Sequence, residues 1–140
     1  MTKTFDAEKI NRLEKEYKLA RAMVEALTHN PTVAFIVCRL DDTVLFVNDT
    51  FEDLFGWGRE EVLNRKLPVV PERMAEDFGA ALRTKNWQIG AYETWKKRKD
   101  GSEFIVSESI VPLRFDGETL ESYACIIRDI TKRKQDERLL

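Results

Sequence analysis

The sequence is poor in the residues from which metal centres and nucleophilic sites are usually built. It holds one histidine and two cysteines among 140 residues, and Cys38 and Cys125 stand far apart in apolar surroundings. That spacing matches no zinc or thioredoxin-type motif, so both are expected to be buried structural thiols. Phosphate-binding glycine loops, nucleophile elbows and metal-ligand clusters are missing as well. We therefore expect no metal site and no catalysis by this chain alone.

Long hydrophobic runs and an excess of charge of one sign are also missing. The longest apolar run, Val33–Cys38, is far shorter than the roughly 20 residues of a membrane-spanning helix, and no basic-then-apolar leader opens the chain. Twenty-three basic and 25 acidic residues give a net charge of -2, which offers no overall attraction to nucleic acid or anionic lipid. With reduced cysteines, these features predict a cytoplasmic segment without membrane or nucleic-acid contacts.

Residues 1–27 carry the pattern of an amphipathic helix. Apolar residues recur at alternating spacings of three and four, as at the a and d positions of a coiled coil: Ile10, Leu13, Tyr17, Ala20, Val24 and Leu27. The helix either pairs with its copy in a second chain or folds back on its own domain. Fewer than three heptads do not separate these alternatives. We expect pairing, and therefore a homodimer.

Residues 28–129 are predicted to form one α+β domain. β-branched and aromatic stretches indicate strands at 33–38, 44–47, 91–98, 104–113 and 120–128, with Asp-Gly turns at 100–101 and 116–117. Helices are expected at 48–56, at 59–63 and after Pro71. The order β-β-α-α-α-β-β-β predicts a five-stranded antiparallel sheet with helices on one face. Residues 130–140 are expected to start a charged C-terminal helix.

Two polar features of this sheet each admit two interpretations. The basic cluster Lys96–Lys99 either grips phosphates or lies on an edge strand, where lysines discourage pairing with another sheet; the negative net charge favours the edge strand. Glu108 is in phase with Phe104, Val106 and Ile110 on one strand face. Its carboxylate either points into a cavity and binds something, or reaches water over a half-covered face. We expect it to be solvated.

Several short motifs, in consistent order, resemble those of a PAS domain. Residues 46–51, 54–57 and 59–62 resemble the opening of that fold, and residues 97–102 resemble the hairpin between its third and fourth strands. Asp129-Ile130-Thr131 resembles the triplet that ends the fold, before a signalling helix. Together these motifs extend over residues 28–135. The resemblance implies a PAS-like sensory and dimerising module, whose flanking helices carry the output to another domain of the same protein.

The resemblance also implies where a ligand and a signal would act. The sheet would cup a small cavity under the helices, lined by Phe35, Phe46, Phe55, Met74, Phe78, Leu82, Glu108 and Ile126. Asp129, Ile130 and Thr131 would transmit the signal. The output domain is expected to be a histidine kinase, with a diguanylate cyclase or a transcription factor as the alternatives. The alternative for the module itself is a constitutive dimerisation spacer without any stimulus.

Two cofactors of PAS-like domains are not expected. The flavin-binding relatives carry a cysteine in the helical segment, but Asn64–Pro68 has none. The haem-binding relatives supply a histidine from the long helix, and Met74–Trp87 has none. His29 lies outside the cavity-forming segments. A small molecule held without covalent or axial bonds is one possibility, and a core filled by its own side chains is the other.

Overall fold

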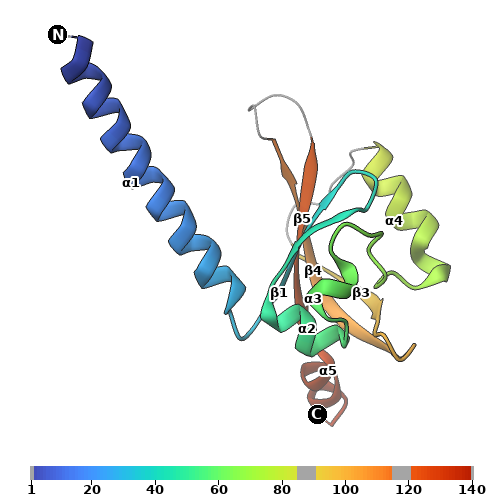
Figure 1. Cartoon of the computed structure of the whole chain (residues 1–140). Coiled ribbons are helices and arrows are strands. Elements are labelled where there is room, and N and C mark those ends of the chain that lie inside the picture. The colour runs from blue at the N-terminus through green and yellow to red at the C-terminus, as the bar shows by residue number, and fades with distance from the viewer. Residues whose placement is uncertain (1, 85–90, 115–120, 140) are drawn as a thin grey trace.

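The strands of the computed structural model, which describes residues 2–84, 91–114 and 121–139, form one antiparallel sheet (Figure 1). Its members are β1 (Ala34–Arg39), β2 (Val44–Val47), β3 (Tyr92–Lys97), β4 (Glu103–Leu113) and β5 (Ser122–Asp129). Their order across the sheet is β2-β1-β5-β4-β3, so β2 and β3 are the edges. The predicted fold class is confirmed. The predicted Asp116-Gly117 turn lies outside the described residues.

Between β2 and β3, the described part of the chain forms three helices: α2 (Asp49–Phe55), α3 (Arg59–Val62) and α4 (Glu72–Thr84). The bounds of α2 follow from local chemistry. Asn48 caps its N-terminus by accepting a hydrogen bond from the Phe51 amide, and Gly56 ends it in the left-handed region at φ 77°. The segment after α3 returns to the sheet, where the Val44 amide donates to the Arg65 carbonyl.

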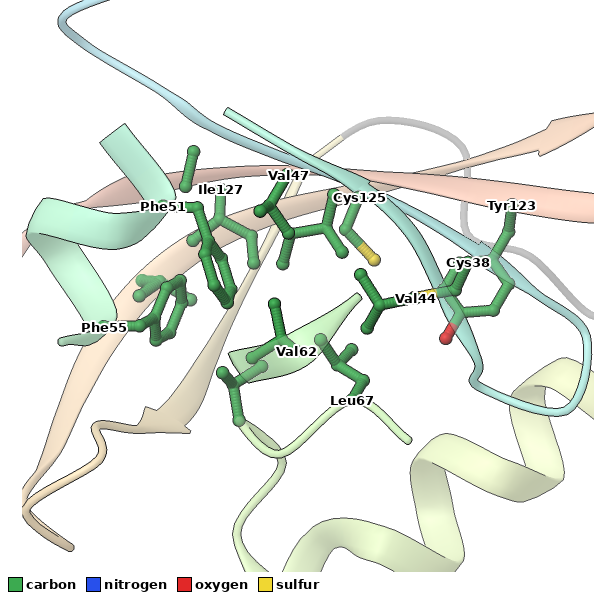
Figure 2. Packing of buried hydrophobic residues seen from close by; sticks show 14 of the residues in the cluster. Cys38, Val44, Val47, Phe51, Phe55, Val62, Leu67, Tyr123, Cys125 and Ile127 are labelled. Atoms are coloured by element: carbon green, nitrogen blue, oxygen red, sulfur yellow. The ribbon is translucent and has the colours of Figure 1, made fainter. Parts of the chain in front are cut away.

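The hydrophobic core fills the space between the sheet and α2–α3 (Figure 2). β1 contributes Ala34, Ile36 and Cys38, which alternate along the strand and are fully buried. Phe51 and Phe55 of α2 pack with their ring centroids 5.0 Å apart. The remaining core side chains come from β2, β4, β5 and the α3 region: Val44, Val47, Val62, Leu67, Val69, Phe104, Val106, Tyr123, Cys125 and Ile127.

The opposite face of the sheet holds three residues that were predicted to line the cavity, and that prediction is wrong for them. Phe35 lies between the buried Ala34 and Ile36 and pairs with Ile126 of β5, so both point away from the core. Phe46 pairs with Val37 on the same outer face. The register shifts between Val37 and Cys38. This bulge reverses the alternation that would place Phe46 beside Val44.

The flanking helices are α1 (Thr2–Thr28) and α5 (Thr131–Leu139). In Figure 1, α1 extends away from the sheet as one continuous helix. Its predicted seam is open to solvent within one chain: Ile10 and Leu13 are each 54% exposed and Tyr17 66%. The fold-back alternative is therefore not the arrangement seen here. No helix in the described part of the chain has the length and hydropathy to cross a bilayer.

Candidate functional site

The joint between α1 and the domain is built around Asn48, whose side chain is fully buried. Its Oδ1 accepts hydrogen bonds from the amides of Phe35 (2.9 Å) and Phe51 (3.1 Å). Its Nδ2 donates to the carbonyls of Leu27 (2.8 Å) and Val33 (2.9 Å). One side chain thus caps α2, fixes the start of β1 and holds the last turn of α1. The sequence predicted a helix that begins at residue 48, but not the contacts of Asn48 with β1 and α1.

Polar contacts on the surface of the same joint add to this anchor. Nδ1 of His29 lies 2.7 Å from Oδ2 of Asp49, and Nη2 of Arg59 lies 3.0 Å from Oδ1 of the same carboxylate. These two partners, His29 first, hold the pKa of Asp49 below its usual value. The Thr50 hydroxyl also donates to the Asn30 carbonyl. The end of α1 is therefore tied to the start of α2 by both side-chain and backbone groups.

A polar cluster lies inside the domain between β3, β4 and α4. Nζ of Lys96 is 2.9 Å from Oε2 of Glu108, and the two side chains are 3% and 1% exposed. The Tyr92 hydroxyl donates to Oε1 of the same carboxylate. Burial, followed by the charge of Glu108, raises the pKa of Tyr92 well above its usual value. Among the described residues, Oε2 has the ammonium group of Lys96 as its charge partner and no further hydrogen-bond donor. We call Tyr92, Lys96 and Glu108 the inner cluster.

The inner cluster corrects two predictions. Glu108 is not solvated, since its face of β4 is covered and Lys96 neutralises its charge. Lys96 does lie on an edge strand, as predicted for the basic cluster, but its side chain points inward, whereas the neighbouring Trp95 is 42% exposed. An isolated buried carboxylate is strongly disfavoured in a protein interior. Lys96 stands opposite Phe104 in the register, and its long side chain brings the ammonium group to Glu108 and removes that cost.

The other predicted cavity residues have different positions. Phe55 belongs to the core and contacts Phe104 with a centroid separation of 5.5 Å. Phe78 of α4 is partly buried against the core, with Tyr123 at its edge and Lys96 4.9 Å from its ring centroid. Met74, also on α4, receives a weak contact from Thr94 of β3. The side chain of Leu82 lies outside the described residues.

The two cysteines are buried on neighbouring strands of the core. Burial raises the pKa of Cys38 to about 12 and that of Cys125 well above its usual value. Both thiols therefore remain protonated and unreactive at neutral pH. In the described ranges, no three histidine, cysteine or carboxylate side chains gather as ligands of a metal ion would.

The exit from the domain is a turn between β5 and α5. Oδ1 of Asp129 accepts hydrogen bonds from the amide (2.9 Å) and the hydroxyl (2.6 Å) of Thr131, the first residue of α5. Ile130 is buried, and its amide donates to the Ile105 carbonyl of β4 at 3.3 Å. The predicted transmission residues therefore lie together, with Ile130 fixed in the sheet and Asp129 bracing the first turn of α5.

A second contact to α5 was not predicted. Glu93 on the edge strand β3 accepts from Arg133 and Lys134 of α5, each at 2.9 Å. Lys134 and then Arg133 hold the pKa of Glu93 below its usual value. Arg133 and Lys134 belong to the charged helix that the sequence predicts after residue 130. Their partner Glu93 lies 40 residues before Arg133. Only the position of β3 at the sheet edge brings them together.

Comparisons with known proteins point to one family. A family model described as a PAS domain matches residues 32–132. The C4-dicarboxylate transport sensor protein DctS of Rhodobacter capsulatus is 31% identical over 134 residues, which cover 92% of this chain and 20% of the relative. This chain therefore spans about a fifth of that protein.

Solved structures show the same fold. The PAS domain of a Colwellia psychrerythraea protein aligns with a TM-score of 0.72 at 20% identity, covering 82% of this chain and 99% of that one. The PAS domain of an HTR-like protein from Haloarcula marismortui aligns with a TM-score of 0.64 at 26% identity, covering 86% of this chain and 99% of that one.

Proposed function

This chain belongs to the PAS domain family, and on that premise we propose that it is a sensory module that regulates an output domain through its two flanking helices. PAS domains are sensory modules, and the sensor protein DctS is similar to this chain along 92% of its length. We propose a histidine kinase as the output domain, in the same protein as this segment. We further propose that the module acts in the cytoplasm as a homodimer, paired along α1.

The observation that carries this proposal is that both flanking helices are bonded to the domain at their near ends. α1 is held through Asn48, which also fixes β1 and α2. α5 is held through Asp129 at its first residue and through Glu93 on β3. A rearrangement of the sheet would therefore alter the direction of each helix. A small ligand in the interior or a partner protein would shift the population between such arrangements.

Replacing Asp129 by alanine in the protein that contains the output domain tests this function. The change removes the brace of α5 and costs about 1 kcal/mol of stability, as expected for loss of a helix-terminal hydrogen bond. We expect the variant to fold and to lose regulation, either locked on or locked off. The measurement is autophosphorylation of the kinase with and without the stimulus.

Asp100→Ala is the matched control. Oδ1 of Asp100 accepts from the amide (2.9 Å) and the hydroxyl (2.6 Å) of Ser102, in the same arrangement as at Asp129. This turn joins β3 to β4, and both of these Asp100 bonds lie within the turn and not on α5. It should lose a similar amount of stability and keep regulated output. If Asp129→Ala also keeps it, Asp129 is only a helix cap, and a dimerisation spacer becomes the better account.

A further inference from the structure

The edge strand β3 has two chemically different faces. Tyr92, Thr94 and Lys96 point toward the interior, where Tyr92 and Lys96 contact Glu108. Glu93 and Trp95 point outward and are exposed. Because side chains alternate along a strand, the inner hydrogen bond of Tyr92 and the outer ion pairs of Glu93 are one residue apart. Any shift of β3 therefore moves both sets of contacts together.

α5 is held to the domain mainly by polar contacts. None of its described residues is buried. Between it and the strands runs an open groove, lined by Trp95, Ile105, Lys134, Glu137 and Arg138. Glu93 spans this groove, because its carboxylate pairs with both Arg133 and Lys134 near the start of α5. Exposed ion pairs are weak, so this attachment can open without unfolding the domain.

We propose that Glu93 is a latch that positions α5 on the edge of the sheet, and that β3 connects this latch to the inner cluster. With the latch closed, Arg133 and Lys134 fix the direction of α5 beyond the turn at Asp129. A change in the inner cluster that displaces β3 would withdraw Glu93 and release the helix. The inference deepens the proposed function by naming the residue that passes the signal from the sheet to α5.

Glu93→Gln in the 140-residue chain tests the latch. The change removes the carboxylate charge and leaves the length of the side chain unchanged. Amide hydrogen exchange of residues 131–139, followed by NMR, should become about two- to fivefold faster, which is the range expected for loss of an exposed ion pair. The melting temperature should stay within about two degrees of the parent, because an exposed side chain is altered.

Glu137→Gln is the matched control for the latch. Glu137 interacts with the same two cations, at 3.8 Å from Arg133 and 3.6 Å from Lys134, but from within α5. Its loss should affect exchange less than Glu93→Gln does. Salt gives a second readout: about 1 M NaCl screens exposed pairs, so it should accelerate exchange in the parent and leave Glu93→Gln almost unchanged. Equal exchange in Glu93→Gln and the parent would overturn the latch.

The connection to the interior is tested by Tyr92→Phe, which removes the hydrogen bond to Glu108 and leaves Glu93 intact. We expect faster exchange in α5 as well, although by a smaller factor than in Glu93→Gln. Unchanged exchange would overturn the role of β3 as the link. The latch and the sensory function are tested separately. If hydrogen exchange in the isolated chain shows no latch, the sensory function still depends on the result for Asp129→Ala. If Asp129→Ala keeps regulated output, the latch still depends on the exchange measurements.

Discussion

Replacing Asn48 by alanine is expected to lower the free energy of unfolding by about 3–5 kcal/mol. The change leaves the amides of Phe35 and Phe51 without their side-chain acceptor, and the carbonyls of Leu27 and Val33 without their donor. Each buried polar group that loses its partner costs about 1–3 kcal/mol, and partial repair by water reduces the sum. Urea unfolding followed by circular dichroism measures the loss.

Two further variants show whether this loss comes from the hydrogen bonds. Asn48→Asp keeps an acceptor for the two amides but presents an oxygen to both carbonyls, so it should not restore the stability of the parent. Asn11→Ala makes the same chemical change at an exposed position of α1 and should alter stability by less than about 0.5 kcal/mol. An Asn48→Ala variant as stable as the parent would mean that Asn48 does not anchor the joint.

Breaking the buried ion pair is the second change with a large expected effect. Lys96→Met leaves Glu108, which is 1% exposed, without its counter-ion, and Glu108→Gln leaves Lys96 likewise unpaired. Removing one partner of a buried pair typically costs about 3–5 kcal/mol, while removing both costs far less. We therefore expect each single variant to be strongly destabilised and the double variant Lys96→Met/Glu108→Gln to recover most of the loss.

An exposed ion pair serves as the comparison. Nζ of Lys99 lies 2.7 Å from Oε2 of Glu61, with side chains 48% and 43% exposed. Lys99→Met and Glu61→Gln should leave the unfolding midpoint nearly unchanged, because water screens that pair. If the losses at Lys96 and Glu108 were simply additive, the two charges would not stabilise each other, and the inner cluster as described would be wrong.

The parts of the fold that could be predicted from the sequence are those set by local chemistry. Asn48 and Gly56 delimit α2 because a side-chain acceptor and a residue at positive φ are needed within a few positions of the helix ends. The order in which the strands follow one another along the chain was predicted from runs of β-branched residues and short turns. These signals do not depend on distant parts of the chain.

Which face a strand buries was much harder to predict. β1 and β5 are apolar on both faces, so nothing in their composition places Phe35 or Ile126 outside the core. On β3, neither face is uniformly apolar, so the polarity of its residues does not predict that Trp95 is 42% exposed and Lys96 only 3%. The reason is Glu108 on β4, which requires a cation on the inner face. That requirement arises only from the pairing of β3 with β4.

Native mass spectrometry of the 140-residue chain tests the central claim most directly, namely that the module works as a dimer paired along α1. The account predicts a species of twice the 16.3 kDa of one chain, and the loss of that species when Ile10, Leu13 and Tyr17 are replaced by glutamate. Leu19→Glu, at an exposed position off the seam, should remain dimeric. A monomeric parent chain, or a dimer that survives the triple replacement, would contradict the account.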